Sequence, residues 1–162
     1  MNAEKVNSVN VKNAHSEKAD IEQLLQSGQT IQICPRGYSM YPMLVPGRDE
    51  VIIKPAVFQE LKRGDVVLYR REESILVLHR IYKIKNNEFY MVGDNQAEVE
   101  GPLQAQQIKG CLTGFIRKGK SISAKNPLYL IASHVWLILL PFRNPLKRIA
   151  ARLKRVVMKQ HK

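Results

Sequence analysis

Three short segments of the sequence contain the side-chain types of a nucleophilic hydrolase. Ser39 lies in the segment GYSMYP, His79 lies in LHR and Asp94 lies in GDN. A serine hydroxyl is a poor nucleophile at neutral pH and needs a neighbouring base, which a histidine can supply. A carboxylate on the other imidazole nitrogen would fix the tautomer and stabilise the imidazolium. These three residues therefore predict acyl-transfer chemistry, provided that the fold brings them together.

Each of these residues also has an ordinary structural interpretation when it is taken alone. A serine between a glycine and a proline is typical of a turn, and the GDN segment directly follows an apolar stretch. His79 stands among apolar residues, where a hydrogen-bonded core histidine is the more common occupant. The spacing of the three residues does not show that they converge, so both interpretations stay open at this point.

The elements that must position these residues are mostly strands. Between Thr30 and Ala124 the chain has short stretches rich in Ile, Val and Tyr, separated by turn residues such as Pro46-Gly47 and Asn86-Asn87. This pattern predicts a mostly β domain over residues 30–125, built as a coiled sheet or partial barrel. The expected strands are Thr30–Cys34, Glu50–Lys54, Val66–Tyr69, Ile75–Lys85, Glu88–Val92, Gln107–Arg117 and Ser121–Ser123.

The N-terminal residues 1–29 predict a polar arm with one short helix. Residues 1–15 are polar and we expect them to be disordered or loosely tethered, whereas Ser16–Gln26 has apolar residues at helical spacing, followed by Gly28 as a stop. This end contains no apolar stretch of the kind that a signal peptide requires. We therefore expect neither a cleavable signal peptide nor an N-terminal membrane anchor.

The C-terminal residues 126–162 combine an apolar stretch with a basic one. Leu128–Phe142 is almost wholly apolar, but a helix of its fifteen residues reaches only roughly 22 Å, against roughly 30 Å for a bilayer core. Beyond Pro145 apolar residues recur at helical spacing between Lys and Arg, which is typical of a helix that lies on an anionic membrane surface. The alternative is a terminal helix that packs on the domain. The apolar positions are Leu146, Ile149, Leu153, Val156 and Val157.

The charge distribution favours a membrane surface over nucleic acid as the partner of this tail. The chain has a formal net charge of +12, and residues 143–162 contribute eight basic residues and no acidic one. A nucleic-acid-binding domain would instead carry its charge across the β domain, with aromatic residues between the basic ones.

Cys34 and Cys111 form no CxxC motif or Cys/His cluster, so we expect buried free thiols, a reducing compartment and no metal site.

Four segments in order resemble a known family. GYSMYPML, LKRGDVVLYR, VLHRI and FYMVGDN resemble the successive motifs of the signal-peptidase superfamily of serine endopeptidases, which includes the self-cleaving SOS repressors. The resemblance implies that Ser39 is the nucleophile and that Gly64-Asp65 is a structural motif. His79 stands where bacterial members have a lysine. A histidine at this position resembles the branch of the endoplasmic reticulum and archaea, which uses a Ser–His arrangement, and Asp94 matches the acidic motif of that branch. It also implies a mostly β fold with the active site at one edge, and no metal or organic cofactor.

The chain departs from that family at three points. The branch often has a second aspartate after the GDN motif, where this chain offers Glu98 and Glu100. Gly37 stands where many bacterial members have a serine in the oxyanion hole, so the main-chain N–H groups near Ser39 would have to form it. The N-terminal membrane anchor of ordinary signal peptidases has no counterpart in the polar N-terminal residues.

These observations predict a serine endopeptidase that cleaves a leader or precursor peptide, with Ser39, His79 and Asp94 as catalytic residues and no cofactor. Its partners would be that peptide and an anionic membrane surface, with the catalytic domain on the cytoplasmic side and no nucleic acid bound. Two alternatives remain: a non-enzymatic basic binding module, for nucleic acid or a membrane surface, and a self-cleaving regulator. The second is disfavoured because only 38 residues precede Ser39 and no lysine stands at the base position.

Overall fold

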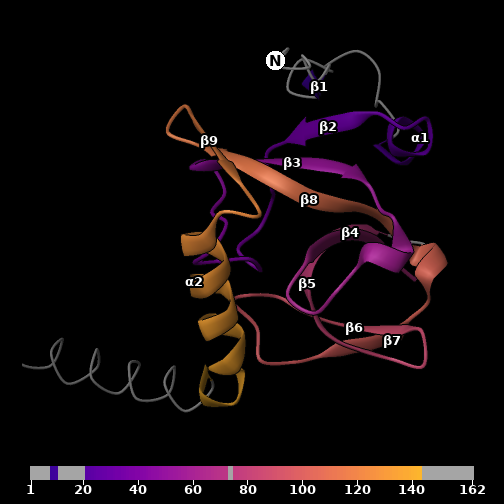
Figure 1. Cartoon of the computed structure of the whole chain (residues 1–162), viewed down its shortest axis with the longest axis vertical. Helices are drawn as coiled ribbons and strands as arrows, with labels where there is room; N and C mark the ends of the chain where they lie inside the picture. The colour runs from indigo at the N-terminus through magenta and orange to yellow at the C-terminus, as the bar shows by residue number, and fades with distance from the viewer. Residues whose placement is uncertain (1–7, 11–20, 73–74, 144–162) are drawn as a thin grey trace, which may run out of the picture.

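The computed structural model describes residues 8–10, 21–72 and 75–143. The predicted basic helix over Leu146–Val157 and most of the predicted N-terminal arm lie outside these described residues. Strands dominate the described part, which confirms the predicted mostly β class (Figure 1). The strands are β1 (Ser8–Asn10), β2 (Thr30–Ile33), β3 (Asp49–Pro55), β4 (Val66–Arg71), β5 (Ile75–Lys85), β6 (Glu88–Val92), β7 (Glu100–Leu103), β8 (Ile108–Arg117) and β9 (Lys120–Ser123).

The described strands form one curved sheet, and among them it does not close into a barrel. Their order is β1-β2-β3-β8-β4-β5-β6-β7, with β9 paired to β8, and only the pairing of β1 with β2 is parallel in the described part of the chain. Register shifts at Ile52/Ile53, Leu68/Tyr69 and Ile81/Lys83 bend the sheet, because an extra residue in one strand increases the local twist. In Figure 1, β2, β3 and β8 lie above β4 to β7.

Alternating apolar residues supply the two cores of this sheet. One core joins α1 (Ile21–Gln26) to β2, β3 and β8, and the other fills the space between β4 and β7. The predicted hairpin turn between β5 and β6 is confirmed, since Asn86 and Asn87 have positive φ values of 52° and 60°. Short 3-10 helices complete the described chain: η2 (Phe58–Glu60), η3 (Ala105–Gln107) and η4 (Leu140–Phe142).

The apolar stretch of the tail folds as α2 (Pro127–Ile138) followed by η4. Asn126 caps α2, because its Oδ1 accepts hydrogen bonds from the N–H groups of Leu128 and Tyr129, and Pro127 occupies the first helical position. The helix stands beside the sheet (Figure 1). Among the described residues, no helix combines the length and the apolar character needed to cross a membrane.

Three details of the sequence-based prediction need correction, and the first is that β7 is a strand where none was predicted. Ser8–Asn10 forms a strand on β2, whereas we expected an unstructured arm there. Both cysteines are free, but Cys34 is exposed, so the expectation of a buried thiol is wrong for it. Cys111 is half-buried, and burial raises the pKa of its thiol to about 12.

Candidate active site

Ser39 lies in the turn that follows β2. Gly37 has a φ of 77°, which favours glycine, and the chain then turns so that Met40 and Leu44 enter the core. Hydrogen bonds from Tyr41 N to Tyr38 O and from Leu44 N to Met40 O hold the turn. The buried side chains anchor the serine in a defined place while its own side chain stays half-buried.

The GDN segment packs against this serine turn. Asn95 N donates a hydrogen bond to Ser39 O over 2.7 Å. A Cβ atom on Gly93 would lie 2.8 Å from the same carbonyl oxygen, so only glycine allows this close approach. Two of the predicted motifs, far apart in the sequence, are therefore in direct contact.

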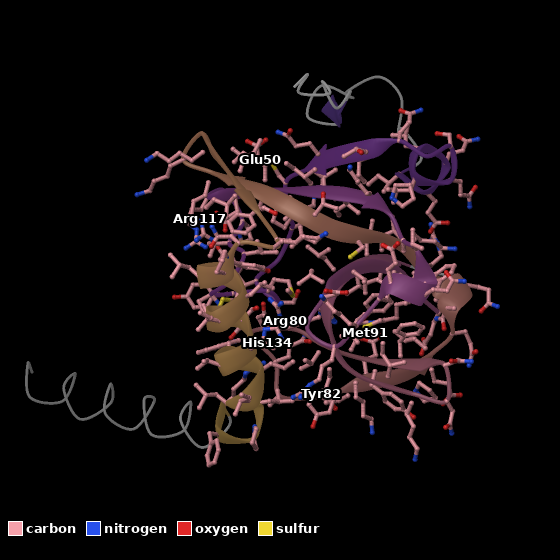
Figure 2. The ribbon with its side chains drawn as sticks, viewed as in Figure 1. Glu50, Arg80, Tyr82, Met91, Arg117 and His134 are labelled. Carbon is pink, nitrogen blue, oxygen red and sulfur yellow. The ribbon has the colours of Figure 1, made fainter. Side chains whose placement is uncertain are left out.

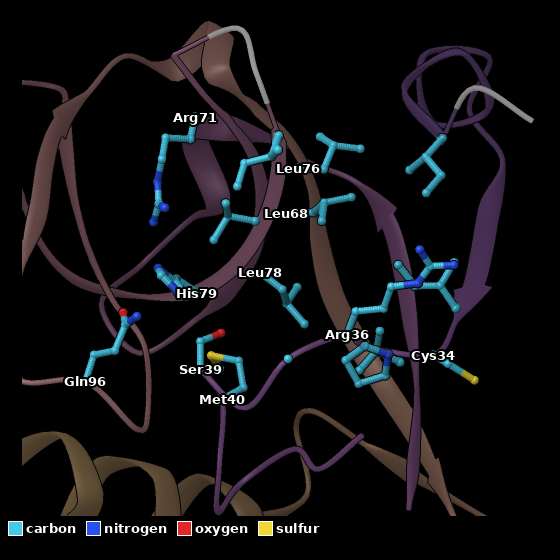
Figure 3. Close-up of a pocket in the computed structure, with 17 residues that line it drawn as sticks. Cys34, Arg36, Ser39, Met40, Leu68, Arg71, Leu76, Leu78, His79 and Gln96 are labelled. Atoms are coloured by element: carbon cyan, nitrogen blue, oxygen red, sulfur yellow. The ribbon is translucent and has the colours of Figure 1, made fainter. Parts of the chain in front are cut away.

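His79 lies on β5 and faces the same pocket as Ser39. The ring is 2% exposed, and His79 pairs in register with Val67 of β4. Figure 3 shows Ser39, His79 and Gln96 at one end of the pocket, with Arg36 and Cys34 at the other. In the part of the chain that the structure describes, no hydrogen bond involves Ser39 Oγ.

A chain of polar groups extends behind His79. The Nδ1 atom lies 3.1 Å from the Tyr69 hydroxyl, which donates a hydrogen bond of 2.8 Å to Glu100 Oε2. Glu100 Oε2 is 3.9 Å from Nδ1 itself. Arg71 clamps the carboxylate by donating from Nε to Oε1 over 2.7 Å and from a second nitrogen to Oε2.

These surroundings set the protonation states of the group. Burial lowers the pKa of His79 to about 4, and the nearby Glu100 carboxylate offsets only part of this effect. Burial and Glu100 both raise the pKa of Tyr69. Burial also raises the pKa of Glu100, but hydrogen bonds from Arg71 and Tyr69 outweigh it, so this pKa lies below its usual value. At neutral pH the group therefore consists of a neutral imidazole, a neutral phenol and a carboxylate.

Asp94 lies near this group but directs its carboxylate elsewhere. Both oxygens accept hydrogen bonds from Arg80, over 2.8 and 2.7 Å, and both side chains are buried. Arg80 also donates to Gly64 O and to the Tyr129 hydroxyl. Its side chain thereby links β5 to α2 (Figure 2). No hydrogen bond between Asp94 and His79 occurs among the described residues. The prediction that Asp94 orients His79 therefore stays a prediction, and its observed partner is Arg80.

The helix α2 is attached to the loop that follows β6. Trp136 Nε1 donates to Asp94 O over 2.7 Å, and Arg143 donates to Gly93 O and Gln96 O over 3.0 and 2.8 Å. Leu137 and Leu140 are buried against Val92. The C-terminal helix thus supports the loop that contacts the serine turn.

The pocket has the form of a groove bordered by strand edges. Its volume is about 690 Å³, and its lining is largely apolar. β4 covers one edge of β5, but β6 pairs only from Arg80 onward, so within the described residues the other edge of residues 75–79 has no strand partner. Across the groove lies the segment from Ile33 to Gly37. An extended peptide can add to such a free edge through main-chain hydrogen bonds.

Main-chain donors are available beside the serine. Among the hydrogen bonds of the described residues, none uses the N–H group of Ser39 or of Met40. A main-chain N–H group without a protein acceptor beside a nucleophile is a candidate donor to an oxyanion. In the described ranges, no group of three or more His, Cys, Asp or Glu side chains has the arrangement of a metal site.

The sequence pattern singled out Ser39, His79 and Glu100 as candidates, but not Tyr69 and Arg71, which contact His79 and Glu100. Tyr69 and Arg71 are two residues apart in β4, so both lie on the face that meets Glu100. This spacing could have indicated them only if the pairing of β4 with β5 and the position of β7 had been known. Comparisons with known proteins add nothing to the geometry: no family model, curated protein or solved structure matches the chain.

Proposed function

We propose that the protein is a serine endopeptidase of the signal-peptidase type, with Ser39 as nucleophile and His79 as general base. The observation that carries this proposal is the common pocket of the two side chains, beside an edge of β5 that has no strand partner among the described residues. The order of the four sequence motifs adds to it. The main-chain N–H groups of Ser39 and Met40, which donate to no acceptor among the described residues, are the candidate donors to the oxyanion.

The reaction begins when His79 Nε2 takes the proton of Ser39 Oγ while this oxygen bonds to the scissile carbonyl carbon. The carbonyl electron pair moves to its oxygen, which accepts hydrogen bonds from the main-chain N–H groups. His79 then returns the proton to the leaving amine as the C–N bond breaks. A water molecule, activated by the same imidazole, hydrolyses the acyl-enzyme and restores Ser39.

The acidic component of this site is Glu100 together with Asp94, in different roles. Glu100 is joined to His79 through Tyr69. Asp94 contributes charge at a greater distance and holds Arg80. The substrate is an extended leader or precursor peptide, since main-chain pairing with the free edge of β5 requires an unfolded segment on both sides of the cleaved bond.

A proteome-derived peptide library tests the activity without knowledge of the substrate. Wild-type protein and Ser39→Ala are each incubated with the library and anionic vesicles, and new peptide termini are identified by mass spectrometry. We expect a consistent set of cleavage sites with the wild type alone. No cleavage, or the same sites with Ser39→Ala, would contradict the proposal.

The pH dependence of cleavage should report the desolvated histidine. Only neutral His79 can act as a base, so kcat/KM should rise with pH through an apparent pKa of about 4 and be nearly full at pH 6. Glu100→Gln should move this midpoint lower, because the carboxylate raises the pKa of His79. A midpoint near the ordinary histidine value of 6.5 would contradict the desolvation of the His79 ring. A rise only above about pH 9, as for a lysine base, would contradict His79 as the general base.

We also propose that the protein binds an anionic membrane surface through its C-terminal region, which holds the catalytic domain on the cytoplasmic side. Four residues at helical spacing form an exposed apolar stripe on α2, and each is more than half exposed: Leu128, Ile131, Val135 and Ile138. The opposite face of the helix is buried through Ser133 and Leu137. Arg143 is buried, and residues 144–162 then add seven basic residues and no acidic one.

Vesicle binding by the full chain tests this second proposal. Replacing Leu128, Ile131 and Val135 by serine should release the protein from phosphatidylcholine/phosphatidylglycerol vesicles, because burial of the stripe supplies the apolar part of the affinity. Replacing Lys147 and Arg148 by glutamine should weaken binding about 30-fold, at roughly 1 kcal/mol per charge, and only at low salt.

The matched control is Val57→Ser with Phe58→Ser, which removes two exposed apolar side chains at η2. We expect unchanged binding for this variant. Equal binding by the wild type and the α2 variant, or tighter binding to duplex DNA than to vesicles, would contradict the membrane proposal.

A further inference from the structure

The direction of the hydrogen bonds behind His79 fixes which of its nitrogens carries the proton. An ionised carboxylate only accepts hydrogen bonds. The single proton of the Tyr69 hydroxyl is therefore used in the hydrogen bond that it donates to Glu100 Oε2. The phenolic oxygen can then only accept from the imidazole nitrogen that lies 3.1 Å away. Nδ1 must therefore carry the hydrogen, which leaves the lone pair of Nε2 free for a proton.

The register of the sheet explains why a tyrosine occupies this place. His79 pairs with Val67, so Tyr69 is its diagonal neighbour on the same face of β4, within reach of a long aromatic side chain. Arg71 follows on that face two residues later and clamps Glu100. Tyr69 is fully buried in the core between β4 and β7, which leaves its hydroxyl little freedom.

We propose that Tyr69 is a positioning residue that connects Glu100 to His79 and fixes the Nδ1–H tautomer, in place of a direct carboxylate contact. This inference rests on the proposed function. When Nε2 accepts the proton of Ser39, the Nδ1–H bond stays intact and donates to the Tyr69 oxygen, whose own proton stays on the phenol. The charged groups that act on the imidazole are Glu100, Arg71 and Asp94.

Tyr69→Phe tests the role of the hydroxyl, because it keeps the buried ring. We expect kcat to fall about 100-fold, in the range that a positioned base contributes, with KM changed less than about twofold. Tyr90→Phe is the matched control, since Tyr90 lies on β6 outside the pocket lining and should keep full activity. Full kcat in Tyr69→Phe would overturn the proposal.

The tautomer itself is measured by ¹⁵N NMR of the imidazole nitrogens, with His79→Gln to assign the signal among the four histidines. We expect Nδ1–H in the wild type, where the Glu100 carboxylate can only accept from Tyr69. Tyr69→Phe should lose this single tautomer. An Nε2–H tautomer in the wild type, or an unchanged spectrum in Tyr69→Phe, would overturn the inference.

The NMR measurement does not depend on cleavage, so the two proposals fail separately. An Nδ1–H tautomer without cleavage of any peptide would refute the endopeptidase and leave the hydrogen-bond order intact. Cleavage with an Nε2–H tautomer would refute the hydrogen-bond order and leave the endopeptidase proposal intact. If Tyr69→Phe does not fold, the tautomer of the wild type decides the question.

Discussion

Replacing Ser39 or His79 by alanine is expected to abolish peptide cleavage while the fold stays intact. The serine supplies the oxygen that bonds to the substrate, and without the histidine this oxygen keeps its proton. Ser39 is half-buried in a turn whose anchoring residues are Met40 and Leu44, so its loss leaves the core unchanged. A loss of at least about 10⁴-fold in kcat, measured on a peptide identified from the library, is the expected magnitude.

The double variant distinguishes a cooperating pair from two separate effects. Residues that act as one unit give non-additive losses, so Ser39→Ala with His79→Ala should be hardly worse than either single change. Additive losses, or substantial activity in Ser39→Ala, would contradict the mechanism. Far-UV circular dichroism and the midpoint of urea unfolding check that all three variants are folded.

Asp94→Asn is expected to destabilise the protein by about 3–5 kcal/mol, because it leaves the buried Arg80 guanidinium without its counter-charge. The measurement is the free energy of unfolding in urea. Arg80→Met combined with Asp94→Leu removes both charges and should recover part of this loss, since a buried ion pair replaced by apolar side chains often costs little.

The same variant separates the two interpretations of Asp94. If Asp94 oriented His79 directly, Asp94→Asn would lower kcat by orders of magnitude at nearly unchanged stability. We expect the stability loss instead, with the fraction that remains folded retaining more activity than Tyr69→Phe. Full stability together with a large loss of kcat would contradict the structural role that we assign to the Arg80 pair.

Much of the sheet could be predicted from the sequence because its strands are locally distinctive. β5 and β6 have the predicted bounds, and the Asn-Asn turn between them restricts the pairing. β7 was missed, because Glu100, Gly101, Pro102 and Leu103 have no strand-like composition and only their pairing with β6 makes them a strand. This omission concealed the position of Glu100 behind His79.

The polar contacts of the site depend on distances that no local pattern contains. Asp94 follows a strand in a turn-like segment, but its partner Arg80 lies on another strand and their pairing is a property of the packed sheet. Tyr69 reads as an ordinary strand residue. The sequence thus indicated Ser39 and His79, which line one pocket in the structure, and not the side chains of Tyr69 and Arg71, which contact His79 and Glu100.

The apolar helix α2 has one face that packs on the domain and one face that stays exposed. The apolar stretch Leu128–Phe142 was interpreted either as a membrane-associating segment or as a helix packed on the domain. One face of α2 is packed through Leu137, and the other leaves Leu128 and Ile131 exposed. Truncation after Lys125 would therefore remove the Trp136 and Arg143 contacts to the site, so substitutions on the exposed face are the better test.

The most direct test of the central claim is the reaction of the full chain with an alkyl fluorophosphonate, followed by intact mass and peptide mapping. In this reaction Ser39 Oγ bonds to phosphorus, fluoride leaves, and His79 takes the serine proton. We predict one adduct, on Ser39, which is absent in Ser39→Ala and forms at least about 100-fold more slowly in His79→Ala. No adduct, an adduct on another residue, or labelling of Ser39 that is independent of His79 would contradict the account.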